Sequence, residues 1–381
     1  MEFMTEERCT LHALMPGLDE QLAAIPLERL ESADGPAIQL FREAGGPGLL
    51  VPREHRGTGA DPHAALRVQR AIGSRCPSLA VATTMHHFSV ATLVAFWQAQ
   101  QGLEWMLLQG IAERRLLLAS GFAEGTHGQG VYRPTMRGRR SGDAVILNGA
   151  KRPCSLARSM DILTASVVVE REQPDGEDEF AIALVAAGLP GVEVAPFWGT
   201  PLLAGAQSDA VVLKDVAVER QLVVGMGGLH RPELDVVQAT GFLWFELLIT
   251  AAYLGIASAL VERMLRDGRG DATSRTAAVA ELESAMASLD GVARRIGETD
   301  VEADRGGMLA RALLCRYAAQ DAINRATALA VEDLGGMAFI GAADVGYLSA
   351  ASQALAFHPP SRRRAAGAID ASLSGAPLVL D

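Results

Sequence analysis

Two ionisable side chains occupy positions where an acid or a base could do chemistry. His358 directly precedes two prolines in "QALAFHPPSRRR" (353–364). Proline lacks an N–H and disfavours the α conformation in the residue before it, so this histidine is expected at the forced end of a helix. Because an imidazole can gain or lose a proton near neutral pH, His358 is a candidate catalytic acid or base.

Glu246 is the second candidate, because it is the only charged residue in "FLWFELLITAAYLGIASALV" (242–261). A carboxylate alone in such an apolar segment is costly, so it should be paired, protonated or functional. The segment has about the length of a bilayer span, but its flanks do not support one. We therefore expect a helix buried among other helices and no membrane partner. A salt bridge to an arginine of a neighbouring helix explains Glu246 as well as catalysis does.

Composition limits the classes of partner. The chain has 381 residues and a formal net charge of −11, which argues against nucleic acid or an anionic membrane surface and favours a small organic substrate or another protein. Its four cysteines lie far apart without a CxxC spacing, so neither a disulfide framework nor a zinc site is suggested. The acidic N-terminus lacks the apolar core of a secretory signal. We expect a cytoplasmic protein.

The elements that would position these residues follow the order helical, β, helical. Residues 1–118 show the helical period, with Asp61 as a cap before "PHAALRVQRAIGSRC". Short β-type runs separated by turns fill residues 119–225. Residues 226–381 return to the helical period, with long segments expected near 233–267, 273–297, 303–334 and 342–357.

The common nucleotide, zinc and serine-hydrolase signatures are missing. No GxGxxG follows a strand, and GxxxxGK[ST], HExxH and GxSxG do not occur. The adjacent pair His86-His87 would point about 100° apart on a helix, so packing explains it better than one shared metal ion does.

Four stretches resemble segments of the acyl-CoA dehydrogenase superfamily, in the same order along the chain. "FREAGGPGLLVPREHRGTGADP" (41–62) is similar to "elGl.glxvPeeyGGxG", and "SGFAEGTHGQG" (120–130) to "LTEPxAGSD". "ILNGAKRPCSLARSMDIL" (146–163) resembles "LNGxKxWITNAxxADxF", and "WGTPLLAGAQSDAVVLKDVAV" resembles "lGmrgsxtxxvxFxdVxVP". The resemblance implies an N-terminal helical domain, a middle β-barrel and a C-terminal four-helix bundle.

The resemblance also implies a bound FAD between the middle domain and the bundle. Ser155 falls on the hydroxyl residue that hydrogen-bonds flavin N5. Phe122 and Ala123 fall on strand residues whose backbone faces the flavin ring, and Gln129 falls where a serine usually contacts the pyrophosphate. The alternative interpretation is that Ser155 is a serine in a turn, where serine is common, without a cofactor role.

Gly335 and Gly336 resemble the family's "QxxGGxG" turn, where a missing Cβ lets a dinucleotide approach the backbone. A glycine pair that ends a helix is the competing interpretation. The sequence also departs from the family pattern. Pro153 replaces the tryptophan that packs over the flavin, Glu332 replaces the glutamine of the glycine turn, and the "RxxFG" element of the adenine site is absent.

Three hypotheses about the reaction remain open. The first is an acyl-thioester dehydrogenase, with coenzyme A or a carrier protein on the substrate, in which His358 or Glu246 removes a proton while a hydride goes to FAD N5. The second is a flavin-dependent monooxygenase, because oxygenases of the superfamily often carry an "HDP"-like segment similar to "FHPP", and a histidine there could stabilise the oxygenated flavin. The third is a non-catalytic member that has lost its flavin.

We place the dehydrogenase first and the monooxygenase close behind it. Two basic clusters, "RGRR" (137–140) and "RRR" (362–364), could contact a phosphopantetheine-bearing partner, although such clusters are more often solvated surface. The family builds part of its FAD site across a subunit interface, so we also expect a homodimer or homotetramer.

Overall fold

The structure is a computed structural model, and it describes residues 2–125, 131, 134–170, 178–228, 234, 236–298 and 304–380. The chain divides into two compact units. One comprises residues 1–115, 200–206 and 239–358, and the other comprises residues 116–199, 207–238 and 359–381. The N-terminal helices and the bundle helices fall in the same unit. The division into three domains at 118/119 and 225/226 stays a prediction.

The first unit is helical, and its N-terminal part is made of short helices around two longer ones. Asp61 caps one of the longer helices as predicted, since its Oδ1 accepts the Ala64 N–H at 2.8 Å. The elements of this part are α1 (Thr5–Leu14), α2 (Leu18–Ala23), α3 (Leu27–Leu30), α4 (Ala37–Glu43), η1 (Gly46–Gly48), η2 (Arg53–His55), α5 (Pro62–Arg75), α6 (Pro77–Gln100) and α7 (Glu104–Arg114).

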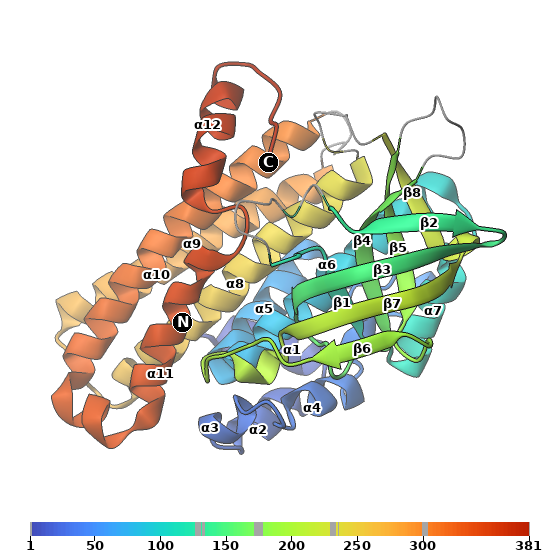
Figure 1. Cartoon of the computed structure of the whole chain (residues 1–381). Coiled ribbons are helices and arrows are strands. Elements are labelled where there is room, and N and C mark those ends of the chain that lie inside the picture. The colour runs from blue at the N-terminus through green and yellow to red at the C-terminus, as the bar shows by residue number, and fades with distance from the viewer. Residues whose placement is uncertain are drawn as a thin grey trace. The chain divides into compact units, whose positions relative to one another are not determined.

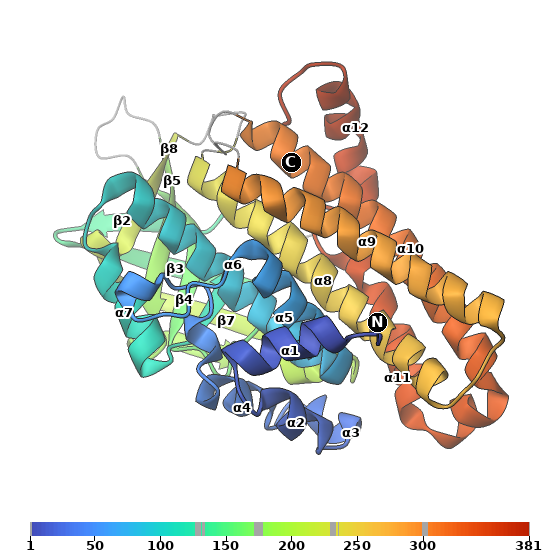
Figure 2. The same ribbon diagram turned by 180° about the vertical axis from the view of Figure 1, so that it is seen from behind.

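Three long helices follow later in the chain, and they run beside one another in Figures 1 and 2. Their bounds agree closely with the predicted segments: α8 (Val236–Arg266), α9 (Ala272–Glu298) and α10 (Arg305–Gly341). The third helix continues past its predicted end. It bends at Gly335, whose φ of 79° and ψ of 168° lie outside the helical region.

The chain then turns back along α10 as α11 (Ala343–Ser352) and the 3₁₀-helix η5 (Gln353–Phe357). His358 follows in an extended conformation, with φ −73° and ψ 138°. The predicted helix stop before the two prolines is therefore confirmed. A last helix, α12 (Arg362–Leu373), carries the second basic cluster.

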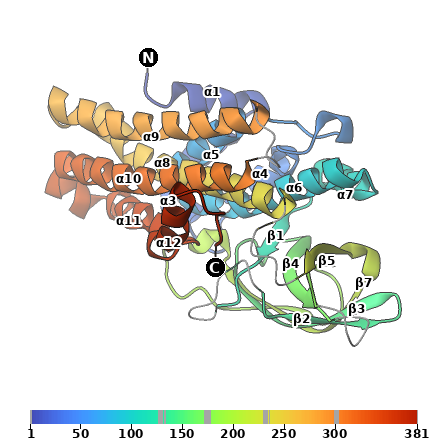
Figure 3. The ribbon, with the colours of Figure 1, turned by 90° about the horizontal axis from the view of Figure 1, so that it is seen from above.

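The second unit contains an eight-stranded mixed sheet, which is strongly curved in Figure 3. Its path is β6-β7-β3-β2-β4-β5-β8, and β1 pairs with β4 in parallel. Because β6 and β8 end this path in the described part of the chain, closure into a barrel stays a prediction. The strands are β1 (Leu118–Gly121), β2 (Arg137–Ser141), β3 (Ala144–Cys154), β4 (Ile162–Val169), β5 (Glu179–Ala186), β6 (Val192–Ala195), β7 (Asp209–Glu219) and β8 (Val223–Gly228).

Two of these strands had no clear sequence signal. β2 is the basic cluster "RGRR" followed by a serine, and its arginines pair with acidic side chains such as Asp178 and Glu179. β8 is short and rich in glycine. In both cases strand pairing decides the conformation, since the composition is unlike that of an average strand.

Two helices are long and apolar enough to cross a membrane by length and composition. The spans are Pro77–Gln100 and Val237–Arg266, and 78% and 89% of their most apolar windows are buried inside the protein. Such burial is typical of core helices in a globular fold. The prediction of a mostly helical protein with a central β region is confirmed.

Candidate active site

Glu246 and Arg316 form a buried ion pair in the helical unit. One guanidinium nitrogen of Arg316, on α10, donates to Glu246 Oε2, on α8, at 2.7 Å, and both side chains are about 1% exposed or less. Burial raises the pKa of Glu246, and the positive charge of Arg316 opposes that rise. The arginine of a neighbouring helix that the sequence left open is therefore present. The second carboxylate oxygen has no hydrogen-bond partner among the residues that the structure describes.

The same arginine holds the end of the last bundle segment. Its other terminal nitrogen donates to the backbone carbonyl of Leu355 at 3.2 Å and also to that of His358. Carbonyls at a helix end lack partners within the helix, and a guanidinium offers five donors. Arg316 thus fixes both the candidate carboxylate and the backbone that carries the candidate histidine.

His358 is held by aromatic residues of α8. Its Nε2 lies 2.9 Å from the hydroxyl oxygen of Tyr253, and its ring lies 6.2 Å from that of Phe245. Burial and the nearby charge of Arg316 lower the pKa of His358 to about 3, and burial raises the pKa of Tyr253. The imidazole is therefore neutral at neutral pH, and the Tyr253 hydroxyl can donate to Nε2 when the ring proton is on Nδ1.

Ser155 lies in the β unit, in the loop that follows β3. It is 8% exposed, and its hydroxyl oxygen lies 3.0 Å from that of Ser208. Two hydroxyls carry two protons, and the hydrogen bond between them uses one. One proton of the pair is left to donate elsewhere, so this loop fits the flavin N5 contact that the family resemblance implies.

Phe122 and Ala123 do not lie in a strand, which corrects the prediction. β1 ends at Gly121, and the Ala123 carbonyl then accepts the Arg152 N–H at 2.8 Å. The strand stops here because the chain turns to pair locally with the end of β3.

The next residue, Glu124, braces this turn against β3. Its Oε1 accepts from Nζ of the fully buried Lys151 at 2.6 Å, and Lys151 also donates to Ser166 at 3.1 Å. Burial alone would raise the pKa of Glu124, but hydrogen bonds from Lys151 and Thr135 lower it to about 2. Residues 122–124 are thus anchored by a charged pair that is ionised at neutral pH.

The remaining predicted cofactor residues stand differently. Position 335 favours glycine because its φ is positive at the bend in α10. Gly336 has no such need, and a Cβ added there would meet no heavy atom within 4 Å. Gln129 lies outside the described residues. Among those residues, no group of three or more His, Cys, Asp or Glu side chains could hold a metal ion.

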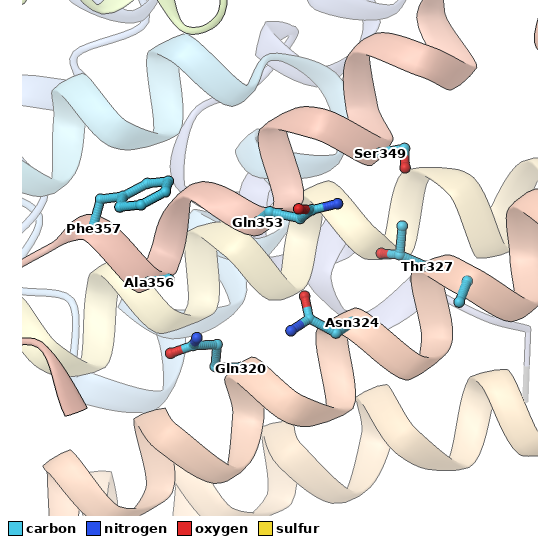
Figure 4. Close-up of a pocket in the computed structure, with 8 residues that line it drawn as sticks. Gln320, Asn324, Thr327, Ser349, Gln353, Ala356 and Phe357 are labelled. Atoms are coloured by element: carbon cyan, nitrogen blue, oxygen red, sulfur yellow. The ribbon is translucent and has the colours of Figure 1, made fainter. Parts of the chain in front are cut away.

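A cavity of about 410 Å³ lies between α10 and the segment formed by α11 and η5. Figure 4 shows Gln320 and Asn324 rising from α10 toward the segment that carries Gln353. Its lining bears no charged side chain, so it offers amide and hydroxyl groups but no cation for a phosphate. The cavity ends at Phe357, the residue before His358.

Sequence reasoning did not single out Arg316 or Tyr253. A signal for Tyr253 existed, because it stands seven residues after Glu246 and therefore on the same face of one helix. Arg316 had no comparable signal among the many arginines of the chain.

Comparison with known proteins agrees with this architecture. No family model matches the chain. Isobutylamine N-hydroxylase from Streptomyces viridifaciens is 43% identical over 99% of this chain and 100% of its own length. A dibenzothiophene monooxygenase from Rhodococcus erythropolis is 29% identical over 64% of this chain and 59% of its own length. A KijD3 structure in complex with FMN and a dTDP-linked amino sugar has a TM-score of 0.82 at 18% identity, and the match covers 97% of this chain and 94% of that one.

The fold and the full-length similarity make the chain a divergent member of the acyl-CoA dehydrogenase superfamily. Within it, the chain belongs to the same family as isobutylamine N-hydroxylase.

Proposed function

We propose that the protein is a flavin-dependent N-hydroxylase of a small aliphatic amine, using reduced flavin and O₂. The full-length similarity to isobutylamine N-hydroxylase supports this class of substrate. The monooxygenase hypothesis thereby moves ahead of the acyl-thioester dehydrogenase, which stays a prediction.

The observation that carries the proposal is that both candidate bases are already engaged. Glu246 is bound by Arg316 at 2.7 Å in a fully buried pair, where its carboxylate faces an arginine. His358 Nε2 lies 2.9 Å from the Tyr253 hydroxyl oxygen, and the pKa of His358 is about 3. A base this weak is poorly matched to removing the α-proton of a thioester, whereas a neutral imidazole with a fixed Nδ1–H is a good hydrogen-bond donor.

Each residue then has a defined part in the reaction. A reduced flavin, when bound, supplies two electrons to O₂, so that one oxygen atom goes to the amine nitrogen and the other leaves as water. His358 would donate a hydrogen bond from Nδ1 to the reacting oxygen. Tyr253, by donating to Nε2, would keep the imidazole in the tautomer that carries its proton on Nδ1. Phe245 and Phe88, whose rings lie 5.6 Å apart, form an apolar wall beside His358 that excludes water.

The flavin itself is proposed to be FMN rather than FAD. The "RxxFG" element, which the family uses for the adenine half, is absent, and Glu332 replaces the glutamine of the glycine turn. Ser155 would hold the flavin ring in either case. Fluorescence titration of the apoprotein with each flavin tests this choice, and tighter binding of FAD would contradict it.

The test of the reaction is product analysis with a separate NADH-dependent flavin reductase. With isobutylamine and ¹⁸O₂, we expect the hydroxylamine to carry one ¹⁸O atom by mass spectrometry. Omitting the reductase should abolish the product, and 2-methylpropanol, which has the same carbon skeleton but no amine, should give none.

A second assay separates the dehydrogenase. Acyl thioesters of coenzyme A and of a carrier protein are added anaerobically to the flavin-loaded protein. Bleaching of the flavin without oxygen would overturn the N-hydroxylase in favour of acyl-thioester dehydrogenation, because hydride would then leave the substrate directly.

A further inference from the structure

A buried carboxylate outside the candidate active site gathers donors from two distant helices. Glu31, at the end of α3, is 3% exposed. It accepts the Ser78 N–H at 3.0 Å and the Ser78 hydroxyl at 2.5 Å, at the start of α6. The Tyr347 hydroxyl, on α11, donates to the same carboxylate. The proposed reaction assigns no part to this cluster of Glu31, Ser78 and Tyr347.

The cluster holds one end of a segment that we call the strap, residues 200–209. The Leu203 N–H donates to the Tyr347 hydroxyl oxygen at 2.9 Å, and the Gly205 N–H donates to the Glu31 carbonyl at 2.8 Å. The fit is tight, because a Cβ on Gly205 would come within 2.9 Å of the Leu30 carbonyl oxygen. Leu203 also has a positive φ of 59°, a conformation that such contacts must maintain.

The other end of the strap grips the Ser155 loop. The Gln207 carbonyl accepts the Ala157 N–H at 3.2 Å, and its side-chain oxygen accepts the Ser159 hydroxyl at 2.7 Å. Ser208 supplies the hydroxyl that lies 3.0 Å from that of Ser155. These three contacts are all made to the loop that the flavin role assigns to N5.

We propose that Glu31 and Tyr347 are positioning residues for the Ser155 loop and act through the strap. Ala206 and Gln207 are consecutive, so fixing residues 203–205 limits the positions open to Gln207 and Ser208. The Ser155 hydroxyl is then oriented before flavin binds, which lowers the ordering cost of binding. For its flavin readout, the inference rests on the proposed function.

The primary test uses the apoprotein and amide hydrogen exchange. Tyr347→Phe removes the hydroxyl that joins Glu31 to Leu203 but keeps the ring. We expect the Leu203 and Gly205 amides to exchange faster, and the Ala157 amide to exchange at least about 10-fold faster, while the Leu163 and Val167 amides of β4 are unchanged. Glu31→Gln gives a second variant that perturbs the same cluster without deleting Tyr347.

Ser74→Ala is the matched control, because it also deletes a buried hydroxyl, which donates to the Ala71 carbonyl on the same helix at 2.8 Å. It should leave Ala157 exchange and flavin affinity unchanged, whereas Tyr347→Phe should raise the Kd for FMN about 10-fold. Faster exchange at Leu203 and Gly205 with an unchanged Ala157 amide would overturn the inference. The proposed function fails separately, if the wild-type protein binds FMN but forms no hydroxylamine.

Discussion

At the scale of single residues, Glu246 and Arg316 show how much a buried charge depends on its partner. Arg316→Met would leave the Glu246 carboxylate unpaired in an apolar interior, and we expect a loss of about 3–5 kcal/mol in the free energy of unfolding. The double variant Arg316→Met/Glu246→Leu should recover most of that loss, because neither charge is then buried. Urea denaturation measures the free energy of unfolding of the single and the double variant. A double variant as unstable as the single one would contradict the ion-pair account.

His358 and Tyr253 make a second prediction at this scale. His358→Ala should lower hydroxylamine formation by roughly 10²–10⁴ with flavin still bound, and Tyr253→Phe should lower it by roughly 10 because only the ring orientation is lost. Since the pKa of His358 is about 3, the pH profile of kcat should show no histidine step between pH 6 and 8. A step there that disappears in His358→Asn would show that the histidine titrates during turnover.

At the scale of elements, the glycine pair at the bend of α10 offers a matched comparison. Gly335→Ala places a side chain at a φ of 79° and should destabilise the protein by about 1–2 kcal/mol. Gly336→Ala lies in helical backbone with open space around it, so it should be neutral or stabilise by up to about 1 kcal/mol.

Flavin titration of the same two variants tests the predicted cofactor role. If Gly336→Ala weakens flavin binding while the fold is intact, the missing Cβ serves a ligand. Unchanged affinity in both variants would leave the backbone bend as the only role of the pair, and the cofactor assignment would be wrong.

At the scale of the whole molecule, buried histidines make stability depend on pH. Burial lowers the pKa of His86 to about 4 and holds that of His87 well below its usual value, whereas both titrate near 6.5 when unfolded. The unfolded chain therefore binds more protons below pH 6.5, and folding stability falls as the pH drops from 6.5 toward 4. At pH 5 the loss should be about 2 kcal/mol for His86 alone.

His87→Leu checks this pH dependence. Neither ring nitrogen of His87 has a hydrogen-bond partner in the described part of the chain, so an apolar side chain of similar size should raise stability at pH 7 by about 1–2 kcal/mol. The substitution should also make the urea concentration at the midpoint of unfolding fall less between pH 6.5 and 5 than it does in the wild-type protein. Denaturation curves that keep the wild-type slope would contradict the assignment.

The predicted homo-oligomer also belongs to this scale. Several large apolar side chains near the end of α10 are exposed, including Met337 at 81% and Ile340 at 80%. Apolar surface of this kind is more often found at interfaces than in open solvent. Sedimentation should show a dimer or tetramer, and Met337→Glu/Ile340→Glu should shift it toward monomer. A wild-type monomer at micromolar concentration would refute the prediction.

Much of the fold could be predicted from the sequence, because local physics decides it. The helical period sets α8 and α9 to within a few residues, Asp61 caps α5 by a contact three residues away, and two prolines stop the chain at His358. The motif around Ser155 is contiguous too, and its flavin role stays a prediction. In each case the residues that matter are close together in sequence, so one short stretch contains all the information needed.

The partners in the site were decided only by tertiary structure. Glu246 meets Arg316 from 70 residues away, Tyr253 meets His358 across 105, and Ser155 meets Ser208 across 53. The sequence holds 34 lysines and arginines, and nothing local distinguishes the one that packing brings to Glu246. Helix period and capping specify where a helix lies along the chain, but the pairing of buried polar groups depends on which helices pack together. That choice arises from burying the whole apolar surface at once, and no short segment encodes it.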